Sequence, residues 1–216
     1  MNLVTFKSPA PQTPFAPSWN YVMGSDFIKE INFKKVSDII LKKEKNLIKN
    51  LPPSYKKDDL NSDGYTGLGS NSLTSRHQAY NIFDWKEKEF QKLKEKVFNF
   101  HKIFLKQLNI TFNKPLFFKG WANVLRKGQC IKTHLHGIHP HTYLSGHLVV
   151  QCNNTSTFYI NPVNQLNDPL VHEEKNQVGR LTLFPGCIPH YTNIHKGPDE
   201  RITLAFDILL KEFYER

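Results

Sequence analysis

Residues 133–151 read THLHGIHPHTYLSGHLVVQ, a stretch that joins five of the chain's ten histidines to a run with the composition of a buried strand. Neutral imidazole is the commonest metal ligand among protein side chains. An accumulation of histidines directly before a strand therefore indicates a metal site at the end of a sheet. His134 and His136 are two residues apart, so in an extended segment both side chains project from the same face and can bind one ion.

A further metal ligand must come from another part of the chain. The best candidate is His190, in the stretch LFPGCIPHYT, because turn residues end the preceding strand and place this histidine at the rim of a sheet. Arg201 follows eleven residues later and begins the strand-like run ERITLAFDI, in which Thr203 shares its face. A fixed guanidinium beside a hydroxyl group suits a carboxylate, which arginine binds through two parallel hydrogen bonds.

Two helices are predicted in the first half of the chain. Apolar residues recur at helical spacing after Ser25, the expected N-cap, until Pro52 and Pro53 end the pattern. A second helix is expected after Asp84. Its apolar stripe consists of Leu93, Val97, Phe100, Phe104 and Leu108.

Short strands are predicted from Pro115 to the end of the chain. The runs rich in aromatic and β-branched residues are LFFKGWANVL, TYLSGHLVVQC, STFYI, GRLTLFPG and ERITLAFDILL. Helices followed by strands predict an α+β fold, an antiparallel sandwich or barrel with the N-terminal helices packed on one sheet. We therefore expect one compact unit, in which residues 1–114 hold an arm, the helices and a lid loop, and residues 115–216 form the β core.

A polar loop separates the two predicted helices. Residues 58–75 read DDLNSDGYTGLGSNSLTS, in which Gly, Asn, Asp and Ser are too dense for regular structure. A loop of this length in a compact domain is commonly functional. We expect residues 64–76 to close over the site, with Arg76, His139 and His141 as candidates for contacts to substrate.

Composition and charge limit the classes of protein. The hydrophobic fraction of 39% indicates a globular chain, and no apolar run approaches the roughly 20 residues that cross a bilayer. The amino terminus lacks the pattern of a secretory signal, so we expect a cytoplasmic protein. The net charge of +10 favours nucleic acid in general, but it consists mostly of Lys on the predicted helices and no nucleic-acid-binding motif is found. An exposed strand edge would allow a homodimer.

The ordered phrases of the second half resemble a known family. WANVLRKG, HLH, YLSGHLVV, TFYINP, GRLTLFPGCIPH and ERITLAFD are similar to a microbial and phage branch of the iron(II)- and 2-oxoglutarate-dependent oxygenases, over about residues 116–208. The resemblance implies a double-stranded β-helix, the jelly roll of cupins, with iron near one mouth. In this family two histidines and usually a carboxylate hold Fe(II) and leave positions for 2-oxoglutarate and O2.

The resemblance also implies roles for particular residues. His134 and His190 correspond to the histidine ligands, while His136 stands where most members have the carboxylate of H-x-D or H-x-E. His139, His141 and a water molecule are alternatives to His136 as the second ligand. The implied contacts to 2-oxoglutarate are Arg201 and Thr203 at its distal carboxylate, with further contacts from Ser145 and His147. Asn123, two residues after Trp121 on an early strand, is a candidate for a hydrogen bond to the keto acid or the substrate, or it satisfies a turn.

The expected function is therefore an oxygenase that hydroxylates a small-molecule or protein substrate and decarboxylates 2-oxoglutarate to succinate. Two alternatives use the same histidines. A cupin-like metalloenzyme that does not use 2-oxoglutarate would not need Arg201. A non-catalytic binding protein of a phage or another assembly would hold a structural metal or none.

Overall fold

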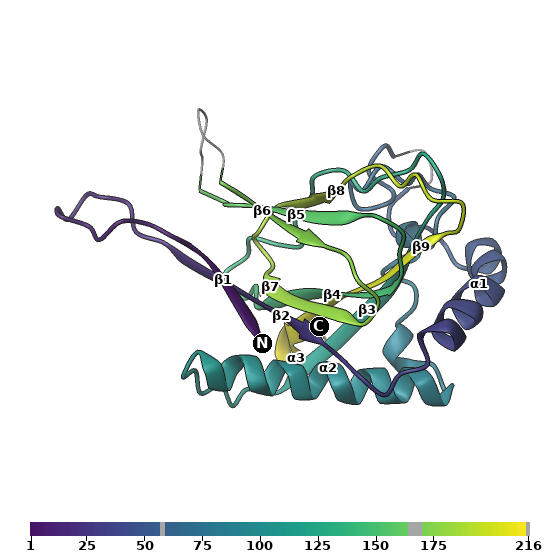
Figure 1. Ribbon diagram of the computed structural model, residues 1–216, viewed down its shortest axis with the longest axis horizontal. Helices are drawn as coiled ribbons and strands as arrows, with labels where there is room; N and C mark the ends of the chain where they lie inside the picture. The colour runs from purple at the N-terminus through teal and green to yellow at the C-terminus, as the bar shows by residue number, and fades with distance from the viewer. Residues whose placement is uncertain (57–58, 164–169, 215–216) are drawn as a thin grey trace.

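The computed structural model describes residues 1–56, 59–163 and 170–214, and its described residues form two antiparallel sheets and three α-helices. The strands of the larger sheet have the order β1-β2-β7-β4-β9-β3, and those of the smaller sheet have the order β6-β5-β8. Figure 1 shows the smaller sheet above one face of the larger sheet. The helices α1 and α2 cover the opposite face.

The strands of the larger sheet are β1 (Asn2–Lys7), β2 (Asn20–Phe27), β3 (Leu116–Leu125), β4 (Leu144–Gln151), β7 (Arg180–Pro185) and β9 (Arg201–Leu210). Those of the smaller sheet are β5 (Ser156–Ile160), β6 (Val171–Lys175) and β8 (His190–Thr192). The helices are α1 (Phe33–Asn50), α2 (Lys88–Gln107) and α3 (Lys211–Tyr214), with the 3-10 turns η1 (Thr74–Arg76) and η2 (Ile82–Asp84).

The two faces of the larger sheet differ because side chains alternate along each strand. Strand β9 lies between β4 and β3 and shows this alternation. The set that packs into the core beneath the helices is Ile202, Leu204, Phe206 and Ile208. The set that lines a cavity on the other face, toward the smaller sheet, is Arg201, Thr203, Ala205 and Asp207. One strand therefore stabilises the fold with one face and supplies the site with the other.

The helices pack on the larger sheet through apolar stripes, as the sequence predicts. On α2, Leu93, Val97, Phe100 and Phe104 are buried and belong to the same core as the sheet. Complete burial of one such side chain contributes roughly 1.5–3 kcal/mol. Helix α1 begins after Asn32, whose side chain accepts a hydrogen bond from the backbone of the third residue after it.

The N-terminal segment differs from the expectation. Ser25 lies in β2 and does not cap a helix, and the predicted arm instead forms the β1–β2 hairpin. Strand β2 pairs with β7, so the larger sheet crosses the boundary expected at residue 114. Gly24 allows β2 to pack closely against α2, since a Cβ atom at this position would lie 2.6 Å from the ring of Phe104. Asp84 was also expected as a cap, but it ends η2, and α2 begins after Glu87.

The described helices include none that combines the length and the apolar character needed to cross a membrane.

A buried histidine on α2 makes the stability of the fold depend on pH. His101 is 3% exposed, and its Nε2 atom lies 2.8 Å from the hydroxyl group of Tyr143. Burial lowers the pKa of His101 to about 4. The unfolded chain takes up this proton near pH 6.5, whereas the folded chain does so near pH 4. The folded protein therefore loses stability as the pH falls through this range.

We predict that His101→Gln makes the free energy of unfolding less dependent on pH between 6.5 and 4. One pKa unit corresponds to about 1.4 kcal/mol, so the difference between the two proteins should change by up to about 3 kcal/mol over this range. Urea denaturation at several pH values measures it. Phe100→Leu, on the same helix, should lower stability equally at every pH. Equal pH dependence in His101→Gln and wild type would contradict the prediction.

Candidate functional site

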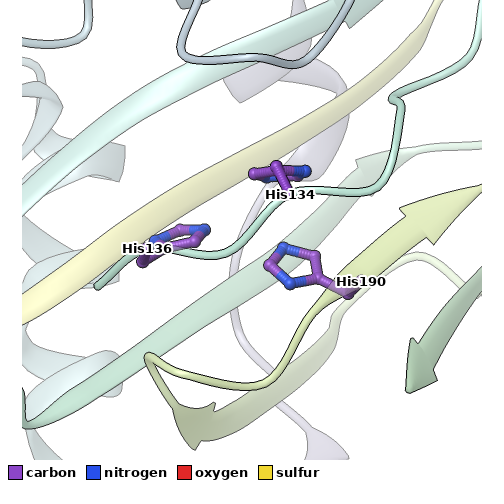
Figure 2. A group of neighbouring side chains, drawn as sticks. All are labelled: His134, His136 and His190. Atoms are coloured by element: carbon purple, nitrogen blue, oxygen red, sulfur yellow. The ribbon is translucent and has the colours of Figure 1, made fainter. Parts of the chain in front are cut away.

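Three histidines from two distant segments meet in the cavity between the sheets. Figure 2 shows the imidazoles of His134, His136 and His190 turned toward one another. One nitrogen atom from each ring lies within 4.8 Å of the corresponding atoms of the other two. The backbones of His134 and His190 form an isolated antiparallel bridge, with N–O distances of 3.1 and 2.9 Å. The predicted convergence of these histidines is therefore present in the structure.

Each imidazole has an oxygen atom beside its Nδ1 atom. The Nδ1 atoms of His134 and His190 lie 2.9 and 3.0 Å from the backbone carbonyl oxygens of Lys132 and Ile188, respectively. The Nδ1 atom of His136 lies 2.5 Å from a carboxylate oxygen of Asp207. Because carbonyl oxygens can only accept, the first two Nδ1 atoms carry the proton and leave Nε2 free as a ligand.

The environment also keeps His134 and His190 neutral. Burial, and secondarily the neighbouring His136, lowers the pKa of His134 to about 4. Burial lowers the pKa of His190 well below its ordinary value. Neutral imidazole is the form that binds metal ions, and a group of three imidazole ligands suits a divalent transition metal such as Fe(II). The donor set therefore fits the metal that the sequence predicts.

A buried guanidinium faces the same cavity. Arg201 is 1% exposed, and its Nε and Nη1 atoms have no hydrogen-bond partner among the residues that the structure describes. Burial lowers the pKa of Arg201 to about 10, so the side chain still carries its charge at neutral pH. An unpaired buried charge is costly, and a bound carboxylate would remove this cost. Thr203 and Asn123 are also buried, face each other across β9 and β3, and line the cavity.

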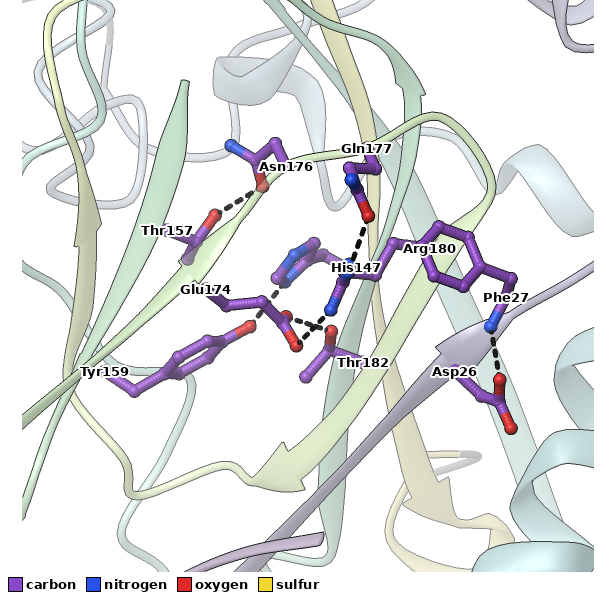
Figure 3. A network of polar contacts seen from close by, with 10 residues as sticks. All are labelled: Asp26, Phe27, His147, Thr157, Tyr159, Glu174, Asn176, Gln177, Arg180 and Thr182. Atoms are coloured by element: carbon purple, nitrogen blue, oxygen red, sulfur yellow. Dashed lines mark hydrogen bonds and ion pairs between the residues drawn. The ribbon is translucent and has the colours of Figure 1, made fainter. Parts of the chain in front are cut away.

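A network of polar side chains supports the cavity from inside the two sheets (Figure 3). His147, on β4, lines the cavity, and its Nδ1 atom lies 2.9 Å from the hydroxyl group of Tyr159. Burial lowers the pKa of His147 to about 4, and its Nε2 atom has no partner in the described part of the chain. Next to them, the buried Glu174 accepts hydrogen bonds from Thr182 and Arg180. A hydroxyl group that donates to Nδ1 leaves the proton of His147 on Nε2.

The cavity has a volume of about 330 Å³ and contains both the histidines and Arg201. The predicted lid loop lies at its wall, with Asp63, Tyr65 and Thr74 among the lining residues. The hydroxyl group of Thr74 donates to the side-chain oxygen of Asn123 at 2.7 Å, which ties the loop to β3. Asp58, at the start of the predicted loop, lies outside the described residues.

Three of the expected site residues lie elsewhere. The guanidinium of Arg76 bonds to backbone carbonyls, including that of Ile48, and does not line this cavity. His141 is exposed, stacks on His139 and Phe213, and also lies outside the lining. Of the two predicted substrate histidines, His139 is the one at the cavity. The group that can hold a metal contains His136 and neither of these histidines.

Ser145 is the third correction. It was expected to contact 2-oxoglutarate, but its hydroxyl group donates to Asp207 at 2.7 Å and it does not line the cavity. Asp207 itself was not anticipated, although it lies six residues after Arg201 on a strand and alternation alone places both on one face. Tyr159 was also missed, because only tertiary structure brings it to His147.

The match to known proteins agrees with this geometry. Residues 119–207 match the model of a family described as "Putative 2OG-Fe(II) oxygenase". The matched segment is similar to the 2OG-Fe(II) oxygenases and contains His134, His136, His190 and Arg201. The resemblance found in the sequence is thus confirmed over this segment, and the description of the family agrees with the expected cofactors Fe(II), 2-oxoglutarate and O2. The replacement of H-x-D by H-x-H stays a prediction.

Solved structures show the same fold. A Pseudomonas putida prolyl-4-hydroxylase is similar to this chain with a TM-score of 0.55 and 12% identity, over 88% of this chain and 92% of that chain. A Trichoplax adhaerens prolyl hydroxylase, in complex with a peptide fragment of the hypoxia inducible factor oxygen degradation domain, gives a TM-score of 0.51 and 14% identity, over 88% and 84%. No curated protein matches the sequence.

We predict that Arg201→Met raises the free energy of unfolding of the ligand-free protein by about 1 kcal/mol, because it removes an unpaired buried charge. Chemical denaturation without carboxylate ligands measures this change. Arg126→Met is the matched control, because Arg126 is half exposed and pairs with the carboxylate of Glu44, which is 6% exposed. Its loss should lower stability by about 1–3 kcal/mol. A destabilised Arg201→Met would contradict the prediction.

Proposed function

We propose that this chain is an iron(II)- and 2-oxoglutarate-dependent oxygenase, a hydroxylase with a double-stranded β-helix core, in which His134, His136 and His190 hold Fe(II) and Arg201 binds 2-oxoglutarate. The observation that carries the proposal is one cavity lined by both the histidine group and a buried guanidinium with unpaired donors. When bound, the iron supplies the centre at which O2 and 2-oxoglutarate react, with decarboxylation to succinate and hydroxylation of a C–H bond.

The side chains on β9 and β4 would bind the co-substrate. The Nε and Nη1 atoms of Arg201 donate to the distal carboxylate of 2-oxoglutarate, and the hydroxyl group of Thr203, two residues along the strand, donates beside them. When the hydroxyl group of Tyr159 donates to Nδ1 of His147, the ring proton is on Nε2, and Nε2 then donates to the same carboxylate. The desolvated wall strengthens each of these charge-assisted bonds. Asn123, held by Thr74, contacts the keto acid or the substrate.

The residues around the opening would bind the substrate. Tyr65, Leu135 and Ile138 line the cavity, and their side chains are 61%, 42% and 74% exposed. An exposed apolar rim around a polar interior suits a substrate with an apolar surface that reaches the metal with one part of its structure. This arrangement supports a peptide segment more than a small polar metabolite. The loop that carries Tyr65 would exclude water from the reaction.

The two alternatives account for fewer of the observations. A cupin-like metalloenzyme without a keto acid, or a non-catalytic assembly protein, has no use for a charge held without partners inside the cavity. The location is proposed as cytoplasmic, and the three free cysteines Cys130, Cys152 and Cys187 support a reducing compartment. The homodimer and the absence of nucleic acid as a partner stay predictions.

We expect Arg201→Met to raise the dissociation constant of 2-oxoglutarate for the Fe(II)-loaded protein by about 10- to 100-fold, the loss of charge-assisted hydrogen bonds worth about 1.5–3 kcal/mol. Anaerobic titration, followed through the visible charge-transfer band of the complex, measures this constant. Arg126→Met should leave it unchanged. The absence of any band in wild type, or equal affinity in Arg201→Met, would speak against 2-oxoglutarate as the co-substrate.

We expect His134→Ala and His190→Ala each to lower the affinity for Mn(II), a redox-stable probe, by at least about tenfold. Isothermal titration calorimetry measures this affinity. His139→Ala is the control, because His139 lines the same cavity outside the ligand group. If His139→Ala weakened Mn(II) binding as much as His134→Ala does, the proposed ligand set would be wrong.

A further inference from the structure

The carboxylate of Asp207 contacts the one histidine that stands where most family members have an acidic metal ligand. Its Oδ1 atom lies 2.5 Å from Nδ1 of His136, and both side chains are largely buried, with exposures of 22% and 7%. The Nδ1 atoms of the other two histidines bond to backbone carbonyls. Of the three imidazoles, His136 is therefore the one with a charged partner.

We propose that Asp207 is a positioning residue that compensates for the missing carboxylate ligand. It does not bind the metal itself but forms a hydrogen bond with His136, which does. This inference rests on the proposed function. A metal ion held by three neutral imidazoles keeps its full charge of +2, whereas a carboxylate ligand reduces that charge. Asp207 returns the negative charge through His136, because a carboxylate at Nδ1 makes the imidazole a stronger donor at Nε2.

The position of Asp207 is itself fixed. It lies on β9 between two neighbouring strands, opposite Ser145 on β4 and Lys119 on β3. The hydroxyl group of Ser145 donates to the same Oδ1 atom at 2.7 Å. The carboxylate therefore faces the cavity from a strand that is paired on both sides, and this strand cannot shift without breaking the core on its other face.

The ring of His136 is held on several sides. Its backbone N–H donates to the carbonyl oxygen of Gly186 at 2.9 Å. The ring of Trp121 lies 5.5 Å from its centroid at an angle of 31°, and that of Phe184 approaches edge-on at 5.9 Å. These contacts limit rotation of the imidazole, and the bond to Asp207 selects the orientation in which Nε2 faces His134 and His190.

A second buried carboxylate provides a matched comparison. Asp63 is 1% exposed and lines the same cavity, but its Oδ2 atom accepts a hydrogen bond from the backbone of Gly69. Asp63 and Asp207 carry the same charge in the same cavity, and Asp207 is the one bonded to a member of the metal group. Neutralising each in turn separates a contact with His136 from the general effect of charge.

The test measures Co(II) affinity by calorimetry and the d–d absorption bands of the Co(II)-loaded full chain. Asp207→Asn should lower the affinity by about 10- to 100-fold and shift the bands, the usual effect of losing the partner of a metal-bound histidine. Asp63→Asn should leave the bands unchanged and lower the affinity less. Equal effects of the two variants on affinity and bands would mean that Asp207 acts only through its charge at a distance, and would overturn the proposal.

A double-mutant comparison adds a signature that a merely structural role would not give. His136→Asp restores the H-x-D ligand of the family, and the aspartate has no ring N–H that could donate to Asp207. In this background Asp207→Asn should leave Co(II) affinity unchanged or raise it, because it removes repulsion between two carboxylates. An equal loss of affinity in both backgrounds would overturn the proposal.

Two further measurements keep the interpretation unambiguous. Circular dichroism verifies that each variant is folded, and Ser145→Ala, which removes only the bond that orients Asp207, should shift the bands in the same direction with a smaller loss of affinity. If wild type binds Co(II) independently of His134, the proposed metal centre fails. If binding depends on His134 but Asp207→Asn changes neither affinity nor bands, the inference on Asp207 fails alone.

Discussion

The bridge between the backbones of His134 and His190 is the constraint on which the site depends. It joins the loop before β4 to the first residue of β8, and so brings together segments that are far apart in the sequence. Because its hydrogen bonds use the main chain, they position both imidazoles whether or not an ion is present. The conformational entropy of ordering this loop is lost on folding, so it does not oppose ligand binding later.

The parts of the site that could be predicted are those that depend on alternation along one strand. Arg201 and Thr203 share a face by their spacing, and the same spacing places Asp207 with them. Asp207 was not identified because an aspartate late in an apolar strand has no local feature that separates a buried residue from a solvated one. Its role depends on contact with His136, which comes from a loop whose path no local pattern determines.

The elements that escaped prediction are those that need a distant partner. Strand β2 pairs with β7, and between β1 and β2 the chain carries several prolines that indicate an extended arm. The three-residue strand β8 is too short for periodicity, and its pairing with β5 defines it. Strand propensity is weak where burial against other strands decides the outcome. The helix stripe of α2 was predictable because its packing face lies within a single segment.

The unpaired guanidinium of Arg201 has a consequence for the lifetime of the protein in a cell. A dicarboxylate that binds the folded chain and not the unfolded chain shifts the folding equilibrium by mass action. The fraction of molecules open to proteases would then fall as the concentration of the keto acid rises. The rate at which the chain is degraded would then depend on how much of its site the proposed co-substrate fills.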